Sequence, residues 1–129
     1  MMQREPRRIK VPIYRAWGLL LAVGWTGSEM ALWLQEQGAI RDEVDSVEMA
    51  GAAVFEVGSD LVIWIPEPYD MGIIVHEAMH AGLRILRTHG VKIESENDEP
   101  ITYFCQWVVE RILNEVQRRR LEDIREVNS

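Results

Sequence analysis

The 129-residue chain contains one cysteine and three histidines, and no apolar run of membrane-spanning length. Cys105 cannot form an internal disulfide, so nothing in the sequence requires an oxidising compartment. Cys105 lies in the apolar run ITYFCQWVV, where a thiol is more often a small core residue than a nucleophile. The apolar run AWGLLLAVGW is roughly half of the ~20 residues that a membrane helix needs. We therefore expect a soluble, cytoplasmic protein with no membrane partner.

Excess positive charge is also absent. The chain has 14 Lys and Arg against 21 Asp and Glu, a net charge of −7. A protein that binds duplex nucleic acid needs a surplus of cations to neutralise phosphates, so no nucleic-acid partner is expected. Phosphate-binding patterns such as G-x-G-x-x-G and G-x-x-x-x-G-K-[ST] are missing, and no serine lies in a nucleophile-elbow pattern. Length and composition indicate one globular domain, residues 1–129.

Hydrophobic patterning and turn residues predict the order of the elements. Residues 1–8 are polar, and we expect them to be loose; residues 39–48 are acidic and read as a loop. The expected elements are a strand over 9–23 with a break near Trp17–Gly18, a helix over 26–38, a hairpin with strands 52–57 and 61–65, a helix over 70–88, and a helix from 98 or 99 to about 127. This order predicts an α+β domain in which a short, mainly antiparallel sheet packs on two major helices.

The segment HEAMH, residues 76–80, is the main functional signal. On a helix, residues four apart share a face, so His76 and His80 can direct ring nitrogens at one ion. Glu77 lies about 100° around the helix from His76 and can reach a metal-bound water without binding the metal. Zinc lowers the pKa of that water to about 7, and a carboxylate can pass its proton to a leaving amine. The motif therefore predicts a zinc site with Glu77 as general base and acid.

A structural interpretation of HEAMH is the alternative. In it, both histidines are polar residues of a buried helix and bind no metal. The strongly apolar surroundings favour the metal site, because two neutral imidazoles and a carboxylate are costly to bury without polar partners.

A catalytic zinc usually has three protein ligands and one open position. His89 lies nine positions after His80, about 900° around a continuing helix, and therefore faces the opposite side. Glu99 begins the last apolar helix and is the favoured third ligand. Tyr103, one turn later, is a candidate to hydrogen-bond a ligand or a reaction oxyanion. The rival third ligands are the acids of the preceding loop, Glu94, Glu96 and Asp98.

These residues resemble the gluzincin branch of the zincin metallopeptidases. In that family HExxH is followed, after a loop, by a helix carrying a glutamate ligand in a pattern like N-E-x-x-S-D. DEPITY is similar, with Asp98 for the Asn, Glu99 for the ligand and Thr102 for the Ser. Tyr103 stands where the family has the Asp that orients a ligand histidine, which is a departure. The resemblance implies a zincin-like fold with zinc held by His76, His80 and Glu99.

The hairpin AAVFEVGSDLVIWI is similar to the zincin sheet, whose edge strand pairs with an extended peptide. This resemblance implies Ala53, Val54 and Phe55 as substrate contacts by β-augmentation. The overall plan, over about residues 9–115, is similar to that of small metallopeptidase-like proteins of bacteriophage genomes. It implies the host bacterial cytoplasm, or the virion, as the location. The second lobe that supplies an oxyanion donor in large gluzincins has no room here, and the candidates to replace it are Tyr14, Tyr69, Tyr103 and His89.

Three hypotheses follow. The first is a minimal zinc-dependent peptidase that acts on an extended peptide. The second is a zincin scaffold that acts as a structural or interaction protein, in which zinc joins two helices. Its amphipathic tail, residues 116–129, would contact a second copy or a viral assembly partner. The third is a metal-free helical core, in which the histidine spacing is a coincidence.

Overall fold

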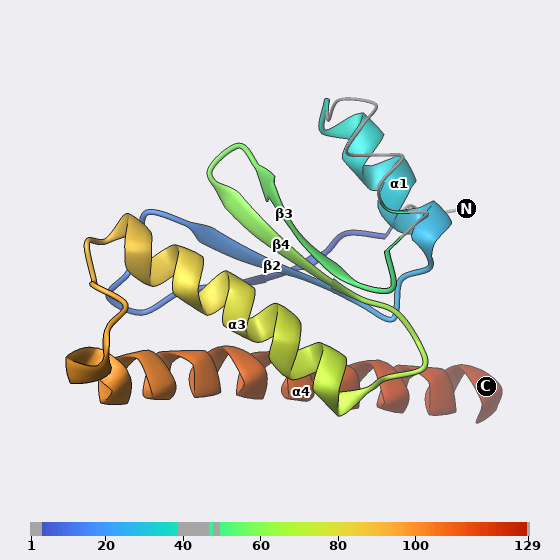
Figure 1. Ribbon diagram of the computed structural model, residues 1–129. Coiled ribbons are helices and arrows are strands. Elements are labelled where there is room, and N and C mark those ends of the chain that lie inside the picture. The colour runs from blue at the N-terminus through green and yellow to red at the C-terminus, as the bar shows by residue number, and fades with distance from the viewer. Residues whose placement is uncertain (1–3, 39–46, 48–49, 129) are drawn as a thin grey trace.

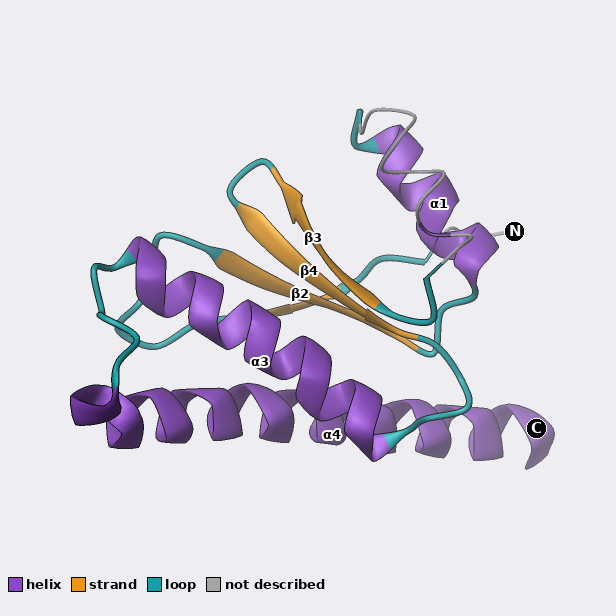
Figure 2. Ribbon diagram, viewed as in Figure 1, coloured by secondary structure: helices purple, strands orange, loops and turns teal. Residues whose placement is uncertain are grey.

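A computed structural model describes residues 4–38, 47 and 50–128 and shows an α+β fold (Figures 1 and 2). In chain order the elements are β1 (Arg7–Ile9), β2 (Gly18–Val23), α1 (Gly27–Glu36), β3 (Ala53–Val57), β4 (Asp60–Ile65), α3 (Met71–Thr88), the 3-10 turn η1 (Ser95–Asn97) and α4 (Asp98–Asn128). The predicted α+β class is confirmed. The loop expected over 39–48 lies outside the described residues, except for Val47.

The four strands form one mixed sheet in the order β1-β2-β4-β3. The β1–β2 and β3–β4 pairs are antiparallel, as expected for a mainly antiparallel sheet, whereas β2 and β4 are parallel. Helices α3 and α4 cover one face of the sheet and α1 the other (Figure 1). Both faces of β2 and β4 are therefore buried, which explains why GLLLAV and DLVIWI read as almost continuous apolar runs.

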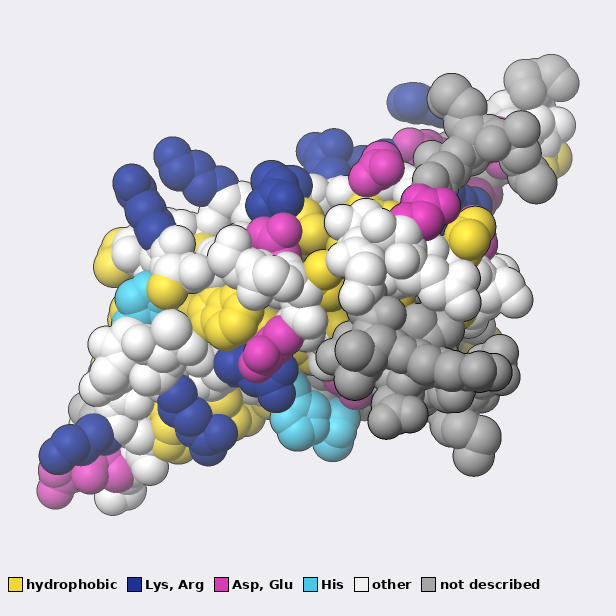
Figure 3. All heavy atoms as spheres, turned by 90° about the horizontal axis from the view of Figure 1, so that it is seen from above, with side chains coloured by type: hydrophobic (Ala, Val, Ile, Leu, Met, Phe, Trp, Pro, Cys, Tyr) yellow, Lys and Arg dark blue, Asp and Glu magenta, His cyan; other side chains and the backbone are white. Residues whose placement is uncertain are grey.

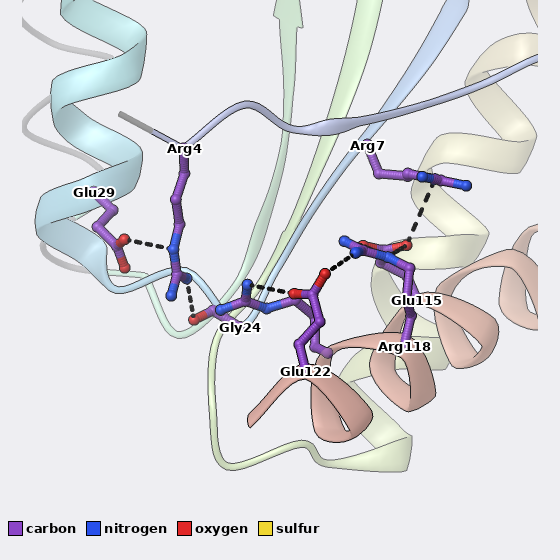
Figure 4. A network of polar contacts seen from close by, with 8 residues as sticks. Arg4, Arg7, Gly24, Glu29, Glu115, Arg118 and Glu122 are labelled. Atoms are coloured by element: carbon purple, nitrogen blue, oxygen red, sulfur yellow. Dashed lines mark hydrogen bonds and ion pairs between the residues drawn. The ribbon is translucent and has the colours of Figure 1, made fainter. Parts of the chain in front are cut away.

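The N-terminal segment differs from the expectation that residues 1–8 are loose. Arg7 and Arg8 belong to β1, which pairs with Leu20 and Leu21 of β2. Arg4 donates a hydrogen bond to the Gly24 carbonyl oxygen at 3.3 Å and forms an ion pair with Glu29 at 3.0 Å (Figure 4). The segment is thus anchored by long-range contacts that the local sequence does not reveal. The expected strand over 9–23 is accordingly divided into β1, a loop and β2.

The tail of α4 is attached to the same region. Glu115 is buried, and it accepts hydrogen bonds from Arg118 and forms an ion pair with Arg7 of β1 (Figure 4). Arg118 also pairs with Glu122, one turn further along the helix. Within the tail, Arg119 lies close to Gly24 and Arg120 lies over the Tyr69 ring, so the expected amphipathic tail packs on the domain through one face. None of the helices in the described part of the chain has the length and apolarity of a membrane-spanning segment.

Helices α3 and α4 run antiparallel and approach closely where Gly82 of α3 faces Cys105 of α4 (Figure 1). A Cβ atom at position 82 would lie 2.8 Å from the Cys105 sulfur, so only glycine fits without a shift. Cys105 is buried, and burial raises the pKa of its thiol. Both observations agree with the expected role of Cys105 as a small core residue. This contact defines the observed register of α4 along α3.

The Gly82–Cys105 contact gives a first prediction. Gly82→Ala is expected to lower the free energy of unfolding by about 1 kcal/mol, because overpacking outweighs the higher helix propensity of alanine. In a Cys105→Ala background the same change is expected to raise it by about 1 kcal/mol, because the sulfur is gone and only the propensity gain is left. Urea unfolding of the four proteins measures the coupling. An equal effect in both backgrounds would contradict this helix register.

Candidate metal centre

His76 and His80 lie on the exposed face of α3, opposite the side chains of Ile74, Ala78 and Ala81 that face the sheet. Their Nε2 atoms are 3.1 Å apart, and the two rings meet edge to face with centroids 4.6 Å apart. Two nitrogens bound to one tetrahedral zinc, each at 2.0–2.1 Å, are about 3.4 Å apart. The pair is thus close to the arrangement of two ligands of one ion. Without a metal, one imidazole can donate a hydrogen bond to the other at the same distance.

Glu77 lies next to this pair but is buried, with 8% of its surface exposed. Burial raises the pKa of its carboxyl above the ordinary 4.5, and positive charge on His76 and His80 opposes that rise. A carboxyl whose pKa is raised towards neutrality is better suited to accept and release a proton than an ordinary surface glutamate. Burial beside two exposed histidines therefore makes the Glu77 carboxylate a stronger base than that of an ordinary surface glutamate.

Glu99 and Tyr103 lie elsewhere. Both are exposed on the first turns of α4, and Tyr103 has 68% of its surface free. With Gly82 opposite Cys105, His80 lies two residues before the crossing and Glu99 six residues before it. On antiparallel helices these offsets add to about 12 Å along the axes. The structure therefore does not bring Glu99 to the histidine pair, and α4 would have to shift by about two turns to do so.

The rival candidates for the third ligand lie at the same end of the domain as Glu99. Glu94, Glu96 and Asp98 are all exposed at the same end of the domain. Among the residues that the structure describes, no group of three or more His, Cys, Asp or Glu side chains is placed to hold a metal ion. The described residues thus bring together the imidazoles of His76 and His80 with the Glu77 carboxyl, and none of the predicted third ligands joins them.

His89 has a structural role, as its helix-end position suggests. It is the C-cap of α3; its Nε2 accepts a hydrogen bond from the Ala16 N–H at 3.2 Å, and its Nδ1 lies 2.8 Å from the Ile85 carbonyl oxygen. Since Nε2 accepts, the hydrogen of neutral His89 is assigned to Nδ1. Both nitrogens are thus engaged, so His89 is a weak candidate for an oxyanion donor.

The remaining oxyanion candidates, Tyr14 and Tyr69, are half-buried against the core. Tyr14 packs edge to face against His89 and Phe104, at the far end of α3 from His76. The Tyr69 hydroxyl lies against Gly24, where a Cβ atom would be 2.6 Å away. Burial raises the pKa of Tyr69, and the negative charge of Glu67 raises it further. Neither contact brings a hydroxyl to the histidine pair.

The hairpin strand β3 is an edge of the sheet and borders α3. Val54 contributes to the core on the α3 side, whereas Ala53 and Phe55 pack on the α1 side. Glu56 of β3 forms an ion pair with Arg84 of α3, with Oε1 and Nη1 3.2 Å apart. Arg84 follows His80 by one turn, so this ion pair links the helix face that carries the histidines to the strand. Figure 3 shows the histidine, basic and acidic side chains that reach this surface.

Sequence reasoning overlooked Arg84, although its spacing continues the pattern His76, His80, Arg84 at four-residue intervals.

Comparison of the chain with protein-family models, with curated proteins and with solved structures gave no match. The geometry of α3 and β3 is therefore the support for a function.

Proposed function

We propose that this domain binds zinc through His76 and His80 and hydrolyses a bond in an extended peptide. The observation that carries the proposal is the convergence of the two exposed Nε2 atoms, 3.1 Å apart, beside the buried carboxyl of Glu77. The two imidazoles fit a zinc ion in donor type and separation. Glu99 is proposed as the third ligand, and its recruitment requires the shift of α4 described above.

Glu77 has the central chemical role in this proposal. A bound zinc would supply a polarised water of lowered pKa as the nucleophile. The Glu77 carboxylate accepts the proton of the attacking water and then donates it to the leaving amine. Burial raises the pKa of the carboxyl and so makes the carboxylate a stronger base towards the proton of the attacking water. Tyr103 is the proposed oxyanion donor and depends on the same shift as Glu99.

The edge position of β3 supports a peptide as substrate. In the described part of the chain β3 pairs only with β4, so its other side offers backbone groups to an added strand. A peptide that pairs with Ala53, Val54 and Phe55 would run along the border of α3, and the Arg84–Glu56 ion pair holds that border in place. This arrangement favours an extended chain over a compact small molecule as substrate.

The test is a peptide-library cleavage screen of zinc-loaded protein, with zinc analysis of Glu99→Ala in parallel. We expect zinc-dependent cleavage in the wild type. Loss of zinc from Glu99→Ala would support the three-ligand site, whereas full zinc retention would assign Glu99 another role. Absence of cleavage across the library by a protein that holds zinc would contradict the peptidase and leave the metal site intact.

A second candidate function is a zinc-stabilised interaction domain. Its specific support is a set of exposed apolar side chains on the last turns of α4: Leu121, Ile124 and Val127. They fit contact with a second copy or a viral assembly partner. This function predicts a concentration-dependent mass in light scattering that Leu121→Ser with Ile124→Ser abolishes. A monomer at all concentrations with no co-purifying partner would count against it.

A further inference from the structure

A hollow of about 470 Å³ lies where β1, the following loop and the start of β2 meet. Three cationic side chains line it, those of Arg8, Lys10 and Arg15, together with Trp17. Ile9 and Val11 add apolar surface. The volume lies within the range of small-molecule sites, and the combination of an apolar lining with a few charged groups is typical of them.

The charge of this hollow is unusual for the chain. Acids outnumber basic residues by 21 to 14, and several other arginines are paired, among them Arg4, Arg7 and Arg84. Arg8 is also paired, with two hydrogen bonds to Asp60 at 3.0 and 3.1 Å. Lys10 and Arg15, in contrast, have no ion-pair partner among the residues described. Three cations and one carboxylate thus leave a net charge of +2 around one hollow, and an anion would relieve their repulsion.

The loop that carries Arg15 is held in place from outside. The Ala16 N–H donates to His89, and the Trp17 indole N–H donates to the Thr88 hydroxyl at 2.8 Å. Within the loop, Ile13 adopts a φ of 67° and exposes 82% of its surface. A β-branched residue at positive φ is strained, and such strain persists where the surrounding contacts fix the backbone, often at binding sites. The loop therefore presents Arg15 and Trp17 in a preformed arrangement.

We propose that this hollow binds a phosphate-bearing small molecule. Lys10 and Arg15 contact the phosphate oxygens, and Arg8 contributes the donors that Asp60 leaves free, since guanidinium and ammonium groups are the usual partners of phosphate. Two unpaired positive charges match a ligand of charge −2 or more negative better than a single carboxylate. Trp17 and the apolar lining contact the rest of the ligand. The site is separate from His76 and His80 and does not depend on the proposed peptidase function.

Isothermal titration calorimetry with pyrophosphate and with ADP, in magnesium-free buffer, tests this inference. The protein is the His76→Ala, His80→Ala variant, so that a metal on α3 cannot bind the anion. We expect saturable binding with a Kd below about 1 mM. Lys10→Gln and Arg15→Gln are each expected to weaken binding about tenfold, because each removes a charge-assisted hydrogen bond. Arg125→Gln, which removes an exposed charge outside the hollow, is expected to have no effect.

Circular dichroism establishes that each variant is folded, which is expected because Lys10 and Arg15 are exposed. Tighter binding of ADP than of pyrophosphate would identify a nucleotide as the ligand. Equal or weaker binding of ADP would identify the phosphate chain alone. No binding of either at about 10 mM, or binding that Lys10→Gln and Arg15→Gln leave unchanged, would overturn the inference.

Discussion

Replacing Glu77 with glutamine is expected to lower kcat for peptide hydrolysis by about 10³-fold while zinc stays bound. The amide keeps the size of the side chain but cannot accept the proton of the attacking water, and general acid–base catalysis typically contributes 10²–10⁴-fold. Steady-state kinetics on a cleaved library peptide and zinc analysis of the same sample measure both properties. Glu110→Gln, which alters an exposed carboxylate on α4, is the matched control and is expected to leave kcat unchanged.

The same substitution is expected to stabilise the metal-free protein. At pH 7 the unfolded chain carries an ionised Glu77, and folding buries that charge; glutamine avoids this cost, which is of the order of 1 kcal/mol. Because burial raises the pKa of Glu77, the wild type loses stability as pH rises from about 4.5 through that raised value. The variant lacks this one titration. The two proteins are therefore expected to be about equally stable below pH 4 and to diverge above it.

Urea unfolding of both proteins in the presence of a chelator, at several pH values, measures this divergence. A Glu77→Gln protein that is less stable than the wild type at pH 7 would make Glu77 a structural residue. A variant that cleaves peptide at the wild-type rate would remove it from catalysis. Stabilisation combined with loss of activity is the pattern of a residue kept for function at the expense of stability.

Replacing His80 with alanine is expected to weaken zinc binding by more than about 100-fold. Loss of a group that only orients a ligand already costs 10–100-fold in affinity, and His80 is proposed as a ligand itself. His76→Ala is expected to have the same effect, because the two Nε2 atoms share one ion. Competition with a chromophoric chelator measures the affinities in untagged protein.

His89→Ala provides the control for the histidine variants. It removes the third histidine of the chain, whose two nitrogens are engaged with Ala16 and Ile85. We expect unchanged zinc affinity and a loss of stability of about 1–2 kcal/mol. Zinc binding that survives in His76→Ala and His80→Ala but falls in His89→Ala would move the site to the other end of α3.

The local parts of this fold follow from the sequence. The four-residue spacing of His76 and His80 places both on one face of α3, and the turn Gly58–Ser59 joins β3 and β4 close to the predicted positions. Thr26, the first residue of the predicted helix over 26–38, caps α1 through a capping box with Glu29. Each of these features depends on residues close together in the chain, where propensity and turn chemistry determine the outcome.

The parts that the sequence did not predict depend on distant contacts. Arg8 meets Asp60 and Ala16 meets His89 across 52 and 73 residues, so neither β1 nor the basic hollow could be found from local pattern. The position of α4 along α3 depends on the fit of Cys105 against Gly82. Nothing in the spacing between His80 and Glu99 specifies that fit. The sequence therefore could not predict that the observed helix register places Glu99 away from the histidine pair.

Zinc content, measured by elemental analysis on protein purified without a histidine tag, tests the central claim most directly. The proposed site predicts close to one zinc per chain in the wild type after incubation with zinc and removal of excess metal. It predicts none above background in the His76→Ala, His80→Ala variant. A wild-type protein that holds no zinc even after incubation would contradict the metal site, and HEAMH would then be a pair of hydrogen-bonded histidines on a helix surface.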